Sequence, residues 1–247
     1  IILAIEKNKP DAIDKMTEAI KDSKIKLCAL SVRYPQGAEK QLIYSATGRI
    51  VPSAQLPMSV GCVVLNVATV YAIAEAVIEG TPLYERVSTI TGSPIAKPGN
   101  WRLRVGTMYE DAVKLAGGFL EDPAKIIFGG PMMGISQYSL QIPITKNCSG
   151  LLFLSTSELS QFHSKACIRC GRCTDVCPMH LYPGVLSVQI ESERFDLAEE
   201  WHVLDCIECG SCAFACPAQR PLVQHVRRAK TEVTASRQAA AAAKKKS

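Results

Sequence analysis

The chain has 247 residues, 47% of them hydrophobic and 21% charged, which is ordinary globular composition with length for two or three modest domains. Its formal net charge of +5 arises in residues 222–247, which contain seven basic residues and one acidic residue, Glu232. The rest of the chain is therefore close to neutral. This distribution excludes a basic body that would bind nucleic acid, and the length makes a disulfide-dependent mini-fold unnecessary.

Residues 1–80 predict an α/β arrangement in which short apolar strands alternate with helices. Pro10 suits the first turn of a helix, and Ile13, Met16 and Ile20 then share one helical face. The expected elements are a strand over residues 1–5, a helix that begins at Pro10, a strand over 25–32, a turn over 34–40, a helix over 41–46 and a loop over 47–59.

Residues 60–78 form a mostly apolar run that is close to membrane-spanning length. The run contains Asn66, Thr69, Tyr71 and Glu75 and lacks charged or aromatic anchors at its ends. A buried strand over residues 61–65, followed by a helix that ends at Gly80, is the better prediction. We therefore expect no segment of this chain to span a bilayer.

Residues 81–155 change to short β-runs separated by turns, with one helix between them. Strands are expected over residues 86–91, 101–105, 125–128 and 151–154, and a helix over 109–116. Two strands, a helix and two more strands predict a small α+β unit of the β-grasp kind. The run from Gly129 to Gly134 lacks a P-loop lysine, so we interpret it as a turn with packing methionines rather than a phosphate cradle.

Eight cysteines near the C-terminal end fall into two runs that share one spacing. Cys167, Cys170, Cys173 and Cys177 form the first run, and Cys206, Cys209, Cys212 and Cys216 form the second; each ends in a cysteine followed by proline. This C-x2-C-x2-C-x3-C-P spacing is that of bacterial ferredoxins with two [4Fe–4S] clusters, in which the fourth cysteine of a run binds the other cluster.

The spacing therefore assigns two ligand sets, each with one exchanged cysteine. The first cluster is expected to take Cys167, Cys170, Cys173 and Cys216, and the second cluster Cys206, Cys209, Cys212 and Cys177. Such an exchange would hold the clusters close enough for electron transfer between them. Apolar positions in residues 185–203 predict two short helices between the runs, and a last helix follows Pro221, so we expect a helical ferredoxin domain.

Two other uses of these cysteines are less satisfactory. A structural zinc site would need two C-x2-C pairs and would leave half of each run unexplained. Disulfides suit short secreted domains. Cys28, Cys62 and Cys148 lie outside the runs in apolar surroundings, where small buried thiols are expected.

The motifs together resemble those of one family, the C subunit of the Rnf electron-transport complex, which couples electron exchange between ferredoxin and NAD to ion movement. The resemblance covers essentially the whole chain. Members usually begin with further sequence that carries a glycine-rich flavin loop, so this chain is expected to be a C-terminal part. The motifs are both cysteine runs and residues 34–37, 39–43, 47–49, 66–67, 129–134 and 221–230.

The same family is similar to the flavoprotein subunit of respiratory complex I, which binds FMN and oxidises NADH. That similarity implies a flavin pocket lined by Ala38, Glu39, Lys40, Asn66 and Thr69. An amide, a hydroxyl and a cation suit a flavin and its phosphate. Ala38 and Ala68 depart from the pattern, in which a glycine and an acidic residue stand at these positions.

The resemblance implies an α+β multidomain chain. Residues 1–80 would complete an FMN- and NADH-binding α/β domain, 81–156 a β-grasp (SLBB-like) domain, and 157–230 a helical ferredoxin domain, while 231–247 would form a basic Ala/Lys-rich tail. The tail could lie on an anionic membrane surface, although a solvated, partly helical extension is the favoured interpretation.

The implied function is that of a peripheral oxidoreductase subunit on the cytoplasmic face of the bacterial plasma membrane. It would exchange electrons with NAD(H) through FMN and relay them through two [4Fe–4S] clusters to ion-translocating membrane partners and to ferredoxin-type carriers. Alternatives are a cobalamin reductase, which has a similar plan, and a non-catalytic iron–sulfur electron-transfer or docking module.

Overall fold

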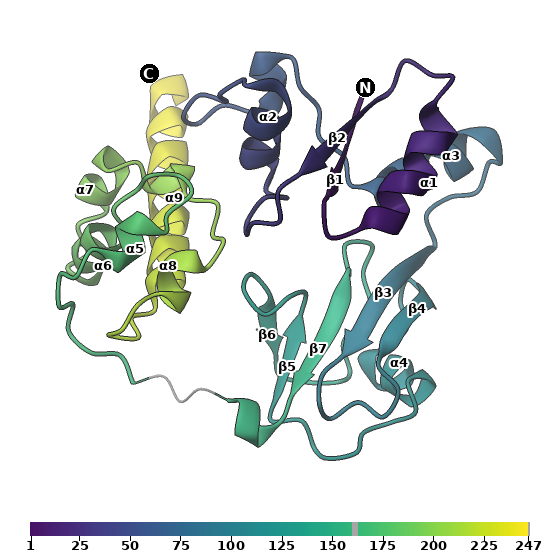
Figure 1. The fold of residues 1–247 in the computed structure, drawn as a ribbon. Coiled ribbons are helices and arrows are strands. Elements are labelled where there is room, and N and C mark those ends of the chain that lie inside the picture. Colours follow the sequence, from purple (N-terminus) through teal and green to yellow (C-terminus); the bar gives the residue numbers. More distant parts are fainter. Residues whose placement is uncertain (160–162, 247) are drawn as a thin grey trace. The chain divides into compact units, whose positions relative to one another are not determined.

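The computed structural model describes residues 1–159 and 163–246 (Figure 1). Residues 160–162, which belong to the predicted cluster domain, and Ser247 lie outside the described residues. The chain divides into two compact units, one made of Ile1–Leu65, Arg169–Cys212 and Leu222–Ser247, the other of Asn66–Ile168 and Ala213–Pro221. Each unit combines segments that are distant in sequence, and the predicted linear domain boundaries stay predictions.

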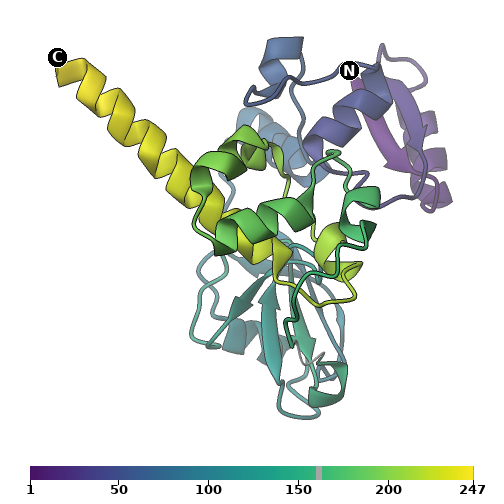
Figure 2. The same cartoon turned by 90° about the vertical axis from the view of Figure 1, so that its left-hand side faces the viewer.

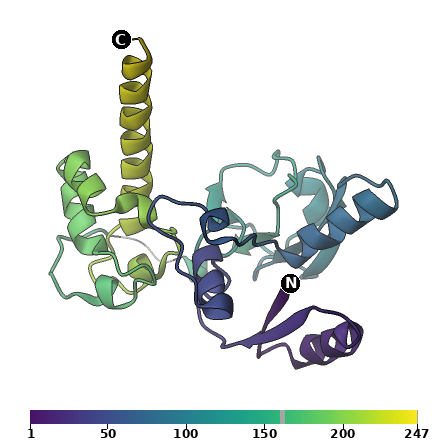
Figure 3. The same cartoon turned by 90° about the horizontal axis from the view of Figure 1, so that it is seen from above.

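The N-terminal segment forms the expected strand–helix–strand unit. Strand β1 (Ile2–Glu6) pairs in parallel with β2 (Lys26–Leu30), with Leu3 opposite Leu27. Because parallel neighbours need a crossover connection, helix α1 (Pro10–Ile20) joins them, and it contacts β2 (Figure 3). Pro10 stands in the first helical turn as predicted, where its missing N–H costs no hydrogen bond.

Helix α2 (Glu39–Thr47) confirms the helix expected over residues 41–46, but it begins two residues earlier. It ends at Gly48, whose φ of 71° is the left-handed conformation that glycine adopts at low cost. The expected loop then runs on to a short 3₁₀ helix, η1 (Pro57–Val60).

The strand predicted over residues 61–65 is wrong, whereas the helix expected after it is present. In the described part of the chain the sheet that contains β1 has two strands, and residues 61–65 pair with neither. Val63 is 77% exposed, so the apolar run is not buried here. Helix α3 (Val67–Ile78) follows, and Gly80 lies just beyond its end with a φ of 69°. A short apolar run does not by itself distinguish a strand from a loop.

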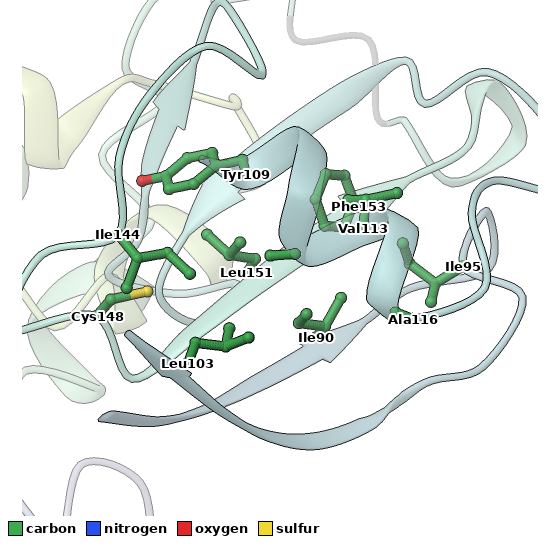
Figure 4. Close-up of a cluster of buried hydrophobic side chains, with 11 residues drawn as sticks. Ile90, Ile95, Leu103, Tyr109, Val113, Ala116, Ile144, Cys148, Leu151 and Phe153 are labelled. Atoms are coloured by element: carbon green, nitrogen blue, oxygen red, sulfur yellow. The ribbon is translucent and has the colours of Figure 1, made fainter. Parts of the chain in front are cut away.

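The second unit contains the β-grasp sheet, in the order β4-β3-β7-β5-β6 over the described residues. Helix α4 covers a core built around Ile90, Tyr109, Leu151 and Phe153 (Figure 4). Alternate residues of these strands, Ser88 and Ile90 in β3 and Leu151 and Phe153 in β7, are buried, so one face of the sheet is directed at this core. The elements are β3 (Glu85–Thr91), β4 (Gly99–Arg104), α4 (Tyr109–Leu115), β5 (Lys125–Phe128), β6 (Ile135–Gln137) and β7 (Gly150–Leu154).

Strand β6 was not predicted, because three residues with two polar side chains give no periodic signal. It pairs antiparallel with β5 across the run from Gly129 to Gly134, which confirms the turn there. At Gly134 an added Cβ would lie 2.4 Å from the carbonyl oxygen of Gly130, so this close approach requires glycine. The two methionines expected to pack there differ, since Met132 is partly buried whereas Met133 is 48% exposed.

The cysteine runs lie among short helices, as the sequence predicted. Helices α6 and α7 lie between the runs, and with α9 they bury Leu186, Ile190, Ala198 and Val226. Helix α9 continues without a break through the predicted tail boundary (Figure 2). The elements are η2 (Thr156–Glu158), α5 (Arg172–Asp175), α6 (Pro183–Glu191), α7 (Phe195–Glu200), η3 (Val203–Asp205), α8 (Ser211–Phe214) and α9 (Leu222–Lys246).

No helix among the described residues combines the length and apolar character needed to cross a membrane.

Candidate metal centre

Four cysteines from the two runs line one pocket within the first unit. They are Cys177 from the first run and Cys206, Cys209 and Cys212 from the second. The rest of the lining is mainly apolar and includes Met179, Leu181 and Val226. This is the ligand set predicted for the second cluster, and its convergence supports the exchanged assignment, which stays a prediction.

Two sulfur atoms of this pocket accept hydrogen bonds from backbone N–H groups. Leu181 N lies 3.4 Å from Cys177 Sγ, and Glu208 N lies 3.3 Å from Cys206 Sγ. Such N–H groups stabilise thiolate ligands and help to set the potential of an iron–sulfur cluster. Burial is the largest influence on Cys206 and raises the pKa of its thiol, against the Glu208 N–H and the Lys230 charge. A thiolate at this position is favoured once a metal supplies positive charge.

Among the described residues, no three or more His, Cys, Asp or Glu side chains form a group that could hold a metal ion. The four thiols instead surround a cavity. A cubane, whose iron atoms occupy four corners of a compact body, needs one thiolate at each of those corners.

Both runs repeat the same backbone conformation at equivalent positions. Two residues after the first cysteine, Arg169 and Glu208 have a φ of 55° each. One residue after the second cysteine, Gly171 and Gly210 have φ values of 78° and 84°. Three residues after the fourth cysteine, His180 and Gln219 have φ values of 54° and 50°. Left-handed residues are uncommon outside glycine, so this match indicates that each run is shaped for the same task.

Helix α9 supplies the charges next to the second run. Lys230 Nζ donates to the carbonyl oxygen of Cys206 at 2.6 Å and to Glu208 Oε1 at 2.8 Å. Arg227 Nε donates to Glu208 Oε2 at 2.8 Å. Burial acts to raise the pKa of Glu208, but the two cations outweigh it and the pKa is lowered. Glu208 is therefore held as a carboxylate that joins the cluster loop to α9.

Residues of the N-terminal segment reach the same loops. Tyr34 Oη donates to the carbonyl oxygen of Cys209 at 2.6 Å, and Gln41 Nε2 donates to the carbonyl oxygen of Pro178 at 2.8 Å. Burial, and secondarily Cys209, raises the pKa of Tyr34, which keeps its hydroxyl protonated as a donor. Nothing in the local sequence pattern indicated these contacts, since Tyr34 and Cys209 are 175 positions apart.

Asp205, immediately before Cys206, is a second point of contact with this segment. Its carboxylate accepts hydrogen bonds from Ser53 Oγ and from Ala54 N, the latter at 3.3 Å, and Lys40 Nζ lies 3.6 Å from it. Burial acts to raise the pKa of Asp205, but these partners outweigh it and the pKa is lowered. Lys40, a predicted flavin residue, thus pairs with a carboxylate beside a predicted ligand.

The first predicted ligand set is divided between the two units. Cys170 and Cys173 belong to the first unit, and Cys167 and Cys216 to the second. The Cys170 side chain is exposed, in contrast with the buried Cys209.

The predicted flavin residues are likewise divided, with Ala38, Glu39 and Lys40 in the first unit and Asn66 and Thr69 in the second. Ala38 precedes the first turn of α2 and Glu39 begins it. Asn66 Oδ1 accepts from Ala68 N at 3.0 Å and caps α3. A role for these residues in binding FMN stays a prediction.

The cysteines outside the runs differ among themselves. Cys148 is fully buried in the β-grasp core, where burial raises the pKa of its thiol, so the expected buried thiol is confirmed. Cys28, in β2, and Cys62, in the loop after η1, are only partly buried, so the expectation of buried thiols is wrong for them.

Three family models match this chain in succession. The Nuo51 FMN-binding domain matches residues 1–75, the SLBB domain residues 87–136, and the 4Fe-4S dicluster domain residues 160–217. These matches confirm the predicted fold class.

Among solved structures, NAD+-reducing [NiFe]-hydrogenase in the H2-reduced state is similar, with a TM-score of 0.56 and 17% identity over 97% of this chain and 53% of the hydrogenase chain. At this identity the likeness concerns the fold alone.

Curated relatives are more similar. The chain is 50% identical over 231 residues to the C subunit of the proton-translocating ferredoxin:NAD(+) oxidoreductase complex of Clostridium ljungdahlii, covering 93% of this chain and 50% of the relative. It is 45% identical to the C subunit of the Na(+)-translocating complex of Acetobacterium woodii, covering 95% and 53%. The chain spans about half the length of these relatives. Over that portion, it is homologous to the C subunits of the ion-translocating ferredoxin:NAD(+) oxidoreductase complexes.

Proposed function

We propose that this chain is the electron-relaying portion of a peripheral subunit in an ion-translocating ferredoxin:NAD oxidoreductase. The observation that carries the proposal is the pocket formed by Cys177, Cys206, Cys209 and Cys212. Four thiols from two runs around one cavity have the ligand number and the exchange expected for a [4Fe–4S] cluster of a two-cluster ferredoxin. The second cluster would be held in this pocket, and the first by Cys167, Cys170, Cys173 and Cys216.

The match of residues 1–75 to an FMN-binding domain supports a flavin upstream of the clusters. Because a hydride carries two electrons and a [4Fe–4S] cluster takes one at a time, FMN in the full-length protein supplies the conversion between them. Ala38, Glu39, Lys40, Asn66 and Thr69 would line its pocket. The cysteine loops and the N–H groups beside their sulfurs would then hold the clusters through which single electrons pass.

The names of the relatives place them in multi-subunit complexes, which supports membrane-bound partner subunits for this chain. Electrons would pass between NAD(H) and ferredoxin-type or other iron–sulfur carriers. We propose that the subunit lies on the cytoplasmic face of the plasma membrane and is held there by integral partners.

Metal analysis of the anaerobically purified chain tests the cluster assignment. We expect about eight iron atoms and about eight acid-labile sulfides per chain, because each cubane contains four of each. A chain that instead contains stoichiometric zinc, with no broad visible absorption, would overturn the proposal.

The flavin residues are tested in the full-length protein with two substitutions at Asn66. Asn66→Asp keeps an oxygen that can cap α3 but removes the amide donor, so FMN retention should fall while α3 stays stable. Asn66→Ala should lose both, at about 1–3 kcal/mol for an unpaired partner. FMN content and NADH oxidation equal to wild type in both variants would show that the pocket lies elsewhere, and an electron-transfer module without flavin chemistry would become the better proposal.

A further inference from the structure

Residues 34–54, which we call the cluster-facing segment, form hydrogen bonds at or beside three of the four predicted ligands of the second cluster. Tyr34 donates to the carbonyl oxygen of Cys209 itself, and Gln41 to that of Pro178, the residue after Cys177. Ser53 and Ala54 donate to the carboxylate of Asp205, the residue before Cys206. All of these residues belong to the first unit.

The hydrogen-bond donors in these contacts favour a reduced cluster in the pocket, because reduction adds one negative charge there. The Tyr34 hydroxyl and the Gln41 amide point donors at carbonyl oxygens of the ligand-bearing loops. Donors so placed withdraw electron density from the peptide groups that flank the thiolates, and their effect is strengthened by low local polarity. Cys209 is 7% exposed, so little water competes at this point.

The contact from Tyr34 comes from the end of its side chain. Tyr34 is 53% exposed overall, so its ring is half in solvent while the hydroxyl forms a 2.6 Å hydrogen bond. Removal of the hydroxyl would therefore delete the donor and leave the ring in place.

The surroundings of Cys170 and Cys173, which are assigned to the first cluster, differ in this respect. Within the described residues, no side chain of the cluster-facing segment forms a hydrogen bond with residues 169–176, and Cys170 is exposed. The influence of the cluster-facing segment should thus fall on one cluster only.

We propose that Tyr34, assisted by Gln41, is a positioning residue of the second cluster that selectively raises its reduction potential. The inference rests on the proposed function, since it requires that Cys177, Cys206, Cys209 and Cys212 hold a cluster. Tyr34 acts through the carbonyl group of Cys209, to which its hydroxyl donates.

The test is a redox titration of the anaerobically purified chain and its Tyr34→Phe variant, followed by electron paramagnetic resonance. The signal of the second cluster is assigned beforehand with Cys209→Ser, because Cys209 is expected to bind that cluster whichever fourth cysteine completes it. Tyr34→Phe should shift the midpoint potential of the second cluster to a more negative value and leave the first cluster unchanged. Gln41→Leu should shift it in the same direction by a smaller amount.

Tyr44→Phe is the matched control, since Tyr44 is exposed on α2 and should leave both potentials as in wild type. Unchanged potentials in Tyr34→Phe, or equal shifts of both clusters, would overturn the inference. The proposed function fails by a separate result, a purified wild-type chain without iron and sulfide.

Discussion

The two cysteine runs have the same local design in different surroundings. Each has the same spacing, the same left-handed residues and a four-residue helix after its second cysteine. Around the second run, Tyr34, Asp205 and Lys230 take part in hydrogen bonds that surround the cysteine loop. In the first run Cys170 is exposed. The comparison shows that ligand geometry can be repeated along a chain while the environment of each site is set separately.

The clearest difference lies at one equivalent position. Glu208 in the second run is held by Arg227 and Lys230, whereas Arg169 in the first run is exposed and has no ion pair within the described residues. Charges near a cluster influence its potential, so this exchange of sign predicts two clusters with unlike properties.

The largest expected effect comes from exchange of ligands between the runs. Cys177→Ala should remove the second cluster, and Cys216→Ala the first, because each fourth cysteine is assigned to the opposite run. Iron content should fall from about eight to roughly four atoms per chain, and electron paramagnetic resonance should show which signal is lost. Cys28→Ala, outside both runs, should leave the iron content unchanged. If Cys177→Ala instead removed only the first-run signal, the exchange would be disproved.

Loss of cluster in air should follow the difference in exposure. With a chelator present, the first cluster should decay several times faster than the second, because Cys170 is exposed and Cys209 is 7% exposed. The two signals are followed by electron paramagnetic resonance in samples frozen at intervals. Equal decay rates would mean that the residues around the second run do not protect its cluster from oxidation.

Removal of a basic side chain should lower the free energy of unfolding more at the second run than at the first. Lys230→Met deletes the donors to Cys206 and Glu208 and should lower the free energy of unfolding by about 1–2 kcal/mol, since charge-assisted hydrogen bonds are lost. The thermal midpoint should fall by roughly 3–6 °C for a chain of this size. Arg169→Met is the matched change in the first run and should stay within about 0.5 kcal/mol. Equal losses in the two variants would contradict the comparison.

The smallest expected loss of stability comes from replacing the glycine after the second cysteine, and it should be the same in both runs. Gly171→Ala and Gly210→Ala each place a Cβ at a left-handed residue and should each cost about 1 kcal/mol. Thermal unfolding of the two variants measures this. A cost in only one run would show that the shared φ values do not reflect a shared constraint.

Much of the fold could be predicted because its signals are local. Pro10 begins α1, apolar positions at helical spacing mark α6 and α7, and short β-runs bounded by turns mark β3 and β7. The strand expected over residues 61–65 was wrong and β6 was missed, since pairing depends on a partner strand that no short run reveals. Asn66 is a further example. Its side chain caps α3, and the sequence was compatible with this role but did not identify it.

The sequence by itself determined the identity and spacing of eight cysteines and the glycines of their loops, because three ligands within seven residues must follow a tight local path. Only the tertiary structure decided what surrounds them. Cys177 meets Cys206, Cys209 and Cys212 in one pocket, and Tyr34 reaches Cys209 across 175 positions of sequence. Contacts of this kind depend on how helices and loops pack. Packing brings together residues that are distant in sequence, and local sequence patterns do not indicate such contacts.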